Sequence, residues 1–187
     1  MPYSLSLFDD VSCDFIKHIR IDSCLDVGTG AGKYGKLVRQ YHPDARISGV
    51  EIDPEYIDQF HLTDIYDDVR CADADGLIDA NSEDTFDLVI LGDCLEHMRK
   101  TRGIDLINFL IYRTNYMLAV YPDHLVQGPW KGHQFESHIS VWSNADFAPF
   151  EACSLQRVPM SFVAINGFLL RRSDPTVREI LSAHLAP

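Results

Sequence analysis

The chain has 187 residues, and its 28 acidic against 16 basic side chains give a formal net charge of −12. A chain of this length is typical of one domain, and a hydrophobic content of 46% excludes an intrinsically disordered chain, which has too little apolar surface to fold. The acidic balance argues against a nucleic acid partner, because the phosphates of DNA and RNA attract clusters of Lys and Arg.

Hydrophobic periodicity predicts strands and helices that alternate through the first two thirds of the chain. Strands are expected at residues 24–27, 47–52, 69–72, 86–91 and 116–121, and helices at residues 9–20, 33–41, 54–62 and 102–113. Alternation of this kind, with short connections, predicts a parallel sheet covered by helices.

The end of the chain predicts a different arrangement. After a short helix near residues 144–150, apolar runs at 153–159 and 162–171 lie too close in sequence for a crossover helix, which needs about a dozen residues. They are therefore expected to form an antiparallel hairpin, followed by a last helix from residue 174. The predicted fold is a three-layer α/β/α sandwich with a mostly parallel, doubly wound sheet and an antiparallel C-terminal hairpin strand.

Neither a membrane nor an oxidising compartment is indicated. No apolar run approaches the roughly 18–20 residues that span a bilayer, and the first residues lack the basic and apolar regions of a signal peptide. The five cysteines include no C-x-x-C pair, so they predict neither a disulfide framework nor a cysteine zinc site. We therefore expect a cytoplasmic protein with no membrane contact.

The most informative segment is the pattern Asp26-x-Gly28-x-Gly30-x-Gly32, between a predicted strand and a predicted helix. Glycines at this junction let the backbone approach a ligand closely. A P-loop requires Ser or Thr after its lysine, but a tyrosine follows Lys33. A dinucleotide fingerprint requires a third glycine where Lys33 stands, so a nicotinamide cofactor is the weaker alternative.

An acidic residue stands where such a loop would need one. Glu51 lies 21 positions after Gly30, at the end of the next predicted strand. A carboxylate at about this spacing can accept hydrogen bonds from both hydroxyls of a ribose. Burying that carboxylate beside a glycine loop would be costly without such a partner.

These features together resemble the class I S-adenosylmethionine-dependent methyltransferases. The glycine pattern is similar to the first motif of that family, and residues 49–54, 71–75 and 86–97 are similar to its second, third and fourth motifs. The similarity covers residues 23–121 and implies S-adenosylmethionine as cofactor. This cofactor is a cation without phosphates. A loop flanked by carboxylates therefore suits it better than it would suit a cofactor with a pyrophosphate, which is negatively charged.

The resemblance also implies roles for particular residues. Asp26 would lie near the methionyl amino group, with space left by the glycines, and Glu51 would hold the ribose. Asp73 would accept from the adenine amino group with Ala74 at the ring, whereas Asp93 and Leu95 would border the sulfonium. The complete implied cofactor set is Asp26, Gly28, Gly30, Gly32, Glu51, Ile52, Asp73, Ala74, Asp93 and Leu95.

Candidate catalytic groups lie in two segments. His97 and Glu96 follow the fourth predicted strand, where α/β sheets bind ligands, although both could instead serve a helix entry. The loop at 122–142 is rich in Pro, Gly and polar residues and is expected to act as a substrate lid. Its His133 is the best candidate base, and His138 is the next.

The same loop contains residues of the types that bind metal ions. The spacing His133-x-x-Glu136-x-His138 would place the last two side chains on one face of an extended segment. It matches no established zinc signature, so no metal is predicted.

The sequence thus predicts one methyltransferase domain at residues 1–187 that methylates a small-molecule acceptor mainly by in-line positioning. Its expected parts are an N-terminal helix, a cofactor-binding core, the lid, and a C-terminal hairpin with a helix, at residues 1–22, 23–121, 122–142 and 143–187. The predicted catalytic residues are His133, His138 and His97. A non-catalytic Rossmann-like binding or scaffold protein and, more remotely, a nicotinamide-dependent oxidoreductase are the alternatives.

Overall fold

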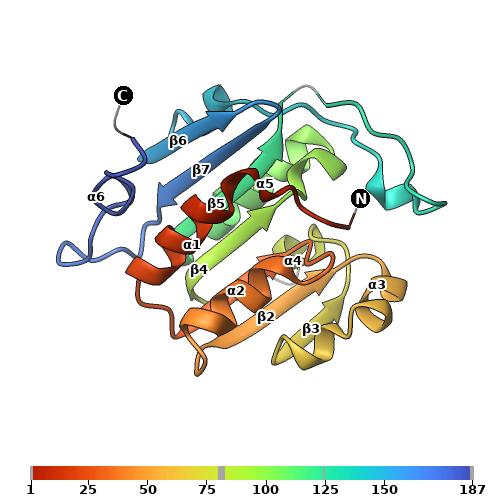
Figure 1. Cartoon of the computed structure of the whole chain (residues 1–187), viewed down its shortest axis with the longest axis horizontal. Helices are drawn as coiled ribbons and strands as arrows, with labels where there is room; N and C mark the ends of the chain where they lie inside the picture. The colour runs from red at the N-terminus through yellow and green to blue at the C-terminus, as the bar shows by residue number, and fades with distance from the viewer. Residues whose placement is uncertain (1, 80–82, 124, 186–187) are drawn as a thin grey trace.

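A seven-stranded sheet with the order β3-β2-β1-β4-β5-β7-β6 runs through the middle of the molecule (Figure 1). The computed structural model describes residues 2–79, 83–123 and 125–185, so position 124 of the predicted lid and the ends of the terminal ranges lie outside the described residues. The strands are β1 (Ser23–Val27), β2 (Arg46–Glu51), β3 (Asp68–Cys71), β4 (Phe86–Gly92), β5 (Thr114–Pro122), β6 (Ala152–Arg157) and β7 (Met160–Asn166).

The strand directions confirm the predicted fold class. β1 pairs in parallel with β2 and β4, β2 pairs in parallel with β3, and β4 pairs in parallel with β5. β7 is antiparallel to both of its neighbours, β5 and β6. The sheet is therefore parallel except at the edge formed by the C-terminal hairpin, in the doubly wound order expected for α/β domains.

Helices cover both faces of the sheet. The α-helices are α1 (Asp9–His18), α2 (Lys33–Tyr41), α3 (Pro54–Gln59), α4 (Gly76–Asp79), α5 (Lys100–Ile111) and α6 (Val177–Ile180). Short 3-10 turns are η1 (Ser6–Phe8), η2 (Leu62–Asp64), η3 (Leu95–His97), η4 (Gln134–Glu136) and η5 (Asn144–Phe147). α1, α2 and α6 pack with the core on one face, and α5 packs with the core on the other.

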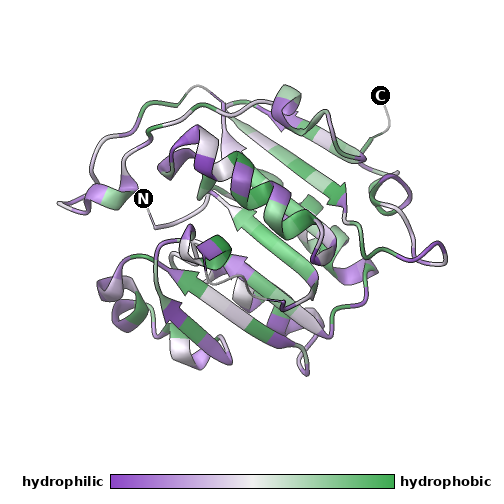
Figure 2. Ribbon diagram, turned by 180° about the vertical axis from the view of Figure 1, so that it is seen from behind, coloured by the Kyte–Doolittle hydropathy of each residue, from purple (hydrophilic) through white to green (hydrophobic). Residues whose placement is uncertain are grey.

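The central strand β4 shows why the sequence specifies this layering. Leu88 and Ile90 belong to the core under α1 and α2, whereas Val89 and Leu91 belong to the core under α5. All four side chains are fully buried. Successive residues of a strand point to opposite faces, so a continuous apolar run fits a strand buried on both sides. In Figure 2 the central strands are accordingly hydrophobic along most of their length, whereas the helices carry both kinds of residue.

Several predicted boundaries move. β7 ends at Asn166 rather than near residue 171, because Gly167 turns against the neighbouring strand: a Cβ there would lie 2.0 Å from the carbonyl oxygen of Thr114. The predicted helix at 144–150 is the single turn η5, and the last helix is the single turn α6 with a Thr176/Glu179 capping box. Asp53 caps α3 by accepting from the Glu55 amide at 3.0 Å.

Candidate cofactor and acceptor site

A cavity of about 310 Å³ opens at the carboxyl ends of β1, β2, β3 and β4. The order of the sheet reverses between β1 and β4, and open α/β sheets bind ligands at such a switch point. Seven of the ten cofactor residues implied by the sequence line this cavity: Gly28, Gly30, Glu51, Ile52, Asp73, Ala74 and Asp93.

The glycine loop forms one wall of the cavity and has no room for side chains. Gly28 has φ +74°, and a Cβ there would lie 2.6 Å from the Cβ of Cys94. A Cβ on Gly30 would lie 2.7 Å from the carbonyl oxygen of Pro2. Gly32 does not line the cavity and instead caps α2 in the left-handed region. Only glycine therefore fits at these two positions, and both residues line the cavity.

Glu51 forms the floor beside this loop and is only 4% exposed. One carboxylate oxygen accepts from the Gly30 amide at 2.8 Å and from the Thr29 hydroxyl at 3.2 Å. The other oxygen accepts from the Asp53 amide at 3.0 Å. Burial raises the pKa of Glu51, and these three donors oppose that shift. The donors also fix the orientation of the carboxylate, which keeps acceptor capacity for a ligand hydroxyl.

Asp26 points away from the cavity. It lies on the same face of β1 as Cys24, under α2, whereas Leu25 and Val27 face the opposite core. Its carboxylate is fully buried and accepts a hydrogen bond from the Tyr66 hydroxyl at 2.6 Å. Burial raises the pKa of Asp26 to about 7. The structure therefore places Asp26 behind the cavity wall, so its predicted position near the methionyl amino group stays a prediction.

Asp93, at the end of β4, faces the cavity in an unusual conformation. Its φ of 52° lies in the left-handed region, which a non-glycine residue adopts at some cost. Its Oδ2 is buried and has no hydrogen-bond partner among the described residues, while the Ser4 hydroxyl bonds to the carboxylate. Burial raises the pKa of Asp93, and the charge of Lys33 opposes that shift. A buried carboxylate oxygen without a partner here suits a cationic ligand.

Leu95 and Asp73 take different positions. Leu95 is fully buried and lies outside the cavity lining, and its carbonyl oxygen accepts from the Trp142 indole at 2.9 Å. Asp73 lies at the rim, where it accepts from the Asp75 amide at 3.2 Å. Asp75 in turn pairs with Arg102 at 2.8 Å, which ties this rim to α5.

The three predicted catalytic histidines do not meet in one place. His97 lines the cavity, and its ring lies 4.9 Å from that of His138, which stands outside the lining. His133 bonds through Nδ1 to Asp53 at 2.5 Å and packs against the Tyr56 ring at 4.8 Å. Burial lowers the pKa of His97 to about 4, so this ring is neutral at pH 7.

The predicted lid reaches the cavity with other residues than the expected histidines. Phe135, Glu136 and Ile139 line it, and the two apolar side chains are 52% and 59% exposed. Within the loop, the His138 amide donates to the Gln127 carbonyl at 2.9 Å, and the Gln127 side chain donates to the Glu136 carbonyl at 2.7 Å. The described part of the loop is therefore an ordered structure with hydrogen bonds of its own.

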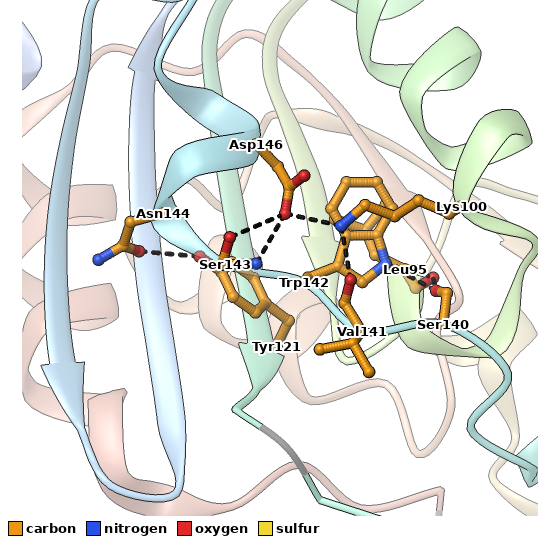
Figure 3. Close-up of polar contacts among 9 residues, drawn as sticks. All are labelled: Leu95, Lys100, Tyr121, Ser140, Val141, Trp142, Ser143, Asn144 and Asp146. Atoms are coloured by element: carbon orange, nitrogen blue, oxygen red, sulfur yellow. Dashed lines mark hydrogen bonds and ion pairs between the residues drawn. The ribbon is translucent and has the colours of Figure 1, made fainter.

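The end of this loop is clamped onto the protein around Trp142 (Figure 3). Trp142 is 1% exposed, and its indole donates to the Leu95 carbonyl. Lys100 lies over the indole ring at 4.0 Å and pairs with Asp146 at 2.6 Å. A Cβ on Gly103 of α5 would lie 2.5 Å from the indole, so the ring rests directly on that helix. The clamp fixes the loop relative to η3.

The N-terminal segment also borders the cavity, which no pattern in the sequence indicated. Pro2 and Ser4 line the cavity, and the Pro2 carbonyl accepts from the Ala31 amide at 2.9 Å. The ring of Tyr3 packs edge to face on Phe60 at 5.5 Å. No local pattern in the first five residues indicates a contact with the glycine loop, so only the tertiary structure could show it.

The fold and this site together define a Rossmann-like domain with a cavity lined by a glycine loop, Glu51 and Asp93. Residues 25–108 match a family model described as a methyltransferase domain. The match covers a little less than half of the chain, and it makes this segment similar to methyltransferase domains, as the glycine pattern indicated. No curated protein sequence matches the chain.

Solved structures share the fold at low sequence identity. An O-methyltransferase family protein from Burkholderia thailandensis is 10% identical with a TM-score of 0.61, over 86% of this chain and 56% of that one. The plantazolicin methyltransferase, solved with S-adenosylhomocysteine, is 12% identical with a TM-score of 0.61, over 87% and 85%. The N-methyltransferase NodS from Bradyrhizobium japonicum, also solved with S-adenosylhomocysteine, is 10% identical with a TM-score of 0.58, over 86% of this chain and 87% of that one.

Proposed function

We propose that this protein transfers the methyl group of S-adenosylmethionine to a small-molecule acceptor that binds in the same cavity. The observation that carries the proposal is the convergence of the glycine loop, Glu51 and Asp93 on one cavity that the apolar side chains of the loop also reach. This arrangement offers carboxylates and bare backbone to a cationic nucleoside, and apolar contact to a second molecule.

The residues fit the cofactor that the family implies. Glu51 would hold the ribose hydroxyls, because its carboxylate is fixed by three donors at the end of β2. Asp93 would face the positively charged part, because one of its buried oxygens has no partner among the described residues. Ile52 and Ala74 would supply apolar contact to the adenine ring. The roles of Asp26, Gly32 and Leu95 remain proposals without a direct place in the cavity lining.

The chemistry requires little from the protein beyond position and dryness. The bound cofactor supplies a methyl group on a sulfonium, which is already activated for displacement. The chain orients the acceptor, and holding two reactants in line accounts for much of a rate enhancement. Pro2 and Ser4 on one side, with Phe135 and Ile139 on the other, border the cavity and limit its water.

The enclosed cavity supports a small acceptor. Within the described residues, the segments that border the cavity besides the cofactor core are the N-terminal segment, η3 and the loop, and these contribute short stretches. We also propose that the loop at 122–142 acts as the substrate lid.

The assignment of catalytic histidines stays a proposal. His97 is the one of the three that lines the cavity, so it is the best placed to contact an acceptor. A pKa of about 4 makes its ring a weak base at neutral pH, since general bases work best with a pKa near the working pH. His133 would act by holding the loop on α3 through Asp53.

A cytoplasmic location and the absence of a nucleic acid partner also belong to the proposal. All five cysteines are free, as a reducing compartment would keep them. In the described residues, no helix is long and apolar enough to cross a membrane. The net charge of −12 disfavours binding to phosphate backbones.

Isothermal titration calorimetry of the purified chain tests the proposal. We expect saturable binding of S-adenosylmethionine and S-adenosylhomocysteine with one site per chain, and no heat with NADH. Absence of heat with either sulfur nucleoside at millimolar concentration would favour the scaffold alternative, and saturable NADH binding would favour the oxidoreductase. Methyl transfer itself is then sought by incubating labelled S-adenosylmethionine with small-molecule extracts and identifying the labelled product by mass spectrometry.

A further inference from the structure

A cluster of metal-ligating side chains lies at the side of the cavity that the loop borders. Glu96 and His97 come from η3, and His138 comes from the loop. Each offers one ligand atom, and these atoms lie within 4.8 Å of one another. This set is not the His133–Glu136–His138 spacing that the sequence brought forward, because His133 lies apart from it, on Asp53.

Glu96 is the feature that most needs a partner. Its side chain is 3% exposed, and its Oε2 has no hydrogen-bond partner anywhere in residues 2–79, 83–123 and 125–185. Its Oε1 lies 4.0 Å from Nε2 of His138, which is beyond hydrogen-bond distance. The negative charge of Asp93, whose Oδ2 is buried, repels the Glu96 carboxylate from nearby. Because an uncompensated buried carboxylate is costly, this arrangement favours a bound cation.

Both imidazole rings are oriented in the way that metal ligands are. Nδ1 of His138 lies 2.8 Å from the Leu125 carbonyl oxygen, and Nδ1 of His97 lies 3.2 Å from the Ser137 carbonyl oxygen. A ring that donates its Nδ1 proton to a backbone carbonyl keeps a lone pair on Nε2. Histidines that bind metals make this second contact almost always, because it fixes the ring and its tautomer.

The backbone holds the two parts of the cluster together. The Glu96 carbonyl accepts from the amides of Ile139 at 2.8 Å and Ser140 at 3.1 Å. The Trp142 clamp then fixes the segment that follows (Figure 3). The residues that follow His138 are thereby attached to η3 at three points, which holds His138 close to Glu96 and His97.

We propose that Glu96, His97 and His138 bind a first-row divalent metal ion such as zinc. Two imidazole nitrogens and one carboxylate oxygen form a ligand set that such ions use, and three protein ligands leave a position open. Around zinc, neighbouring ligand atoms lie about 3.3 Å apart, so small side-chain rotations would close the present set. His97 lines the cavity, which places the open position toward the acceptor.

The role of the metal rests on the proposed function, whereas its binding does not. An acceptor hydroxyl that coordinates the open position would have a lowered pKa and would lose its proton to water. In the transfer the new O–CH3 bond forms as the S–CH3 bond breaks, and the sulfonium becomes a neutral thioether. A metal here would supply the activation of the hydroxyl that a histidine base was expected to supply.

Direct metal binding by the full chain tests the inference. The purified protein is treated with a chelator, dialysed, and titrated with Zn²⁺ by calorimetry, and Co²⁺ is added in parallel for its visible absorption. We expect one tight site per chain. Glu96→Gln, which keeps the shape of the side chain, and His138→Ala should each weaken zinc binding at least tenfold. The matched control is His184→Ala, which removes a histidine that also contacts a carboxylate, Asp14, at 3.0 Å but lies outside the cavity.

Three outcomes would overturn the inference. These are no stoichiometric zinc binding, equal binding by Glu96→Gln and the wild type, or a loss in the His184→Ala control as large as in the cluster variants. The last two would indicate adventitious binding by surface histidines, and the first would leave an ordinary His138–Glu96 pair. Circular dichroism checks that the variants fold. S-adenosylmethionine affinity is measured separately, so failure of the proposed function and failure of the metal site give different results.

Discussion

The two ends of the cavity are built in different ways. The cofactor end is made of backbone and side chains at the ends of adjacent parallel strands, and its parts come from short continuous motifs such as the loop at Gly28 and the strand end at Glu51. The acceptor end is made by η3 and by a loop that returns from β5, held together by hydrogen bonds and the Trp142 clamp. Enzymes that use the same cofactor can bind it on the same rigid scaffold. Their acceptors differ from one enzyme to another and are bound by loops, which vary more easily.

The rigidity of the cofactor end gives the largest expected effect. Gly28→Ala forces a Cβ to 2.6 Å from Cys94 in a residue with φ +74°. Left-handed backbone costs a residue with a side chain about 1–2 kcal/mol, and overpacking adds about 1–3 kcal/mol. We expect the free energy of unfolding, measured with urea, to fall by about 2–5 kcal/mol. Gly128→Ala is the control, because a Cβ there meets no atom within 4 Å and should change stability little. Equal effects would mean that the loop is not tightly packed.

Asp26 lies behind the cavity wall, so its substitution should change stability and not cofactor binding. Its pKa is about 7 in the folded protein and 3.8 in a model peptide. An acid whose folded pKa is raised stabilises fully below the unfolded pKa, and this contribution is lost as pH rises to the folded value. From pH 4 to pH 7 the loss should reach about 4 kcal/mol, since one pKa unit is about 1.4 kcal/mol.

Asp26→Asn should therefore flatten the dependence of unfolding free energy on pH over this window. Because Asp26 lies outside the cavity lining, the affinity for S-adenosylmethionine should stay within about threefold of the wild type. If Asp26→Asn instead loses as much S-adenosylmethionine affinity as Glu51→Ala is expected to lose, Asp26 contacts the methionyl amino group. The site would then have to rearrange when the cofactor binds.

Glu51→Ala should weaken cofactor binding by about 1–3 kcal/mol, which is about 5–150-fold, because ribose hydroxyls would lose a buried acceptor. Calorimetric titration with S-adenosylmethionine measures this. Glu151→Ala removes an exposed acid outside the cavity and should leave the affinity unchanged. Unchanged affinity in Glu51→Ala would place the ribose elsewhere.

A substitution at the acceptor end should have a smaller effect, and the effect should be seen in hydrogen exchange. His133→Ala removes the contact with Asp53 and the packing on Tyr56, which together hold the loop on α3. A lost hydrogen bond of about 1 kcal/mol predicts hydrogen exchange about fivefold faster in residues 130–138, with no change in cofactor affinity. His18→Ala, on α1, is the control. Once an acceptor is identified, kcat of His133→Ala can be compared with that of the wild type. A reduction of about 100-fold or more would mean that His133 acts as a base.

Much of the cofactor end could be predicted because its information is local. The glycine pattern, the distance to Glu51 and the strand ends are all visible as spacing, and strand–helix alternation predicts the parallel sheet. The place of Asp26 outside the cavity lining follows from alternation with Leu25 and Val27 in β1, which face the opposite core. Its implied role near the methionyl amino group stays a prediction.

The acceptor end could not be predicted in the same way. His97 and His138 meet only because the Glu96 carbonyl accepts from the amides of the loop, which is a contact between distant parts of the sequence. The place of Pro2 on the glycine loop is another such contact. Periodicity detects neither, since both depend on how a non-repetitive segment packs.

The clamp and the lid also equip the protein with its own optical reporters. The chain has two tryptophans. Trp142 is buried in the clamp, whereas Trp130 lies half-buried in the loop and exchanges backbone hydrogen bonds with His133. Emission from the first would follow global unfolding, and emission from the second would follow the loop. Opening of the acceptor end can therefore be timed in solution without attaching a dye.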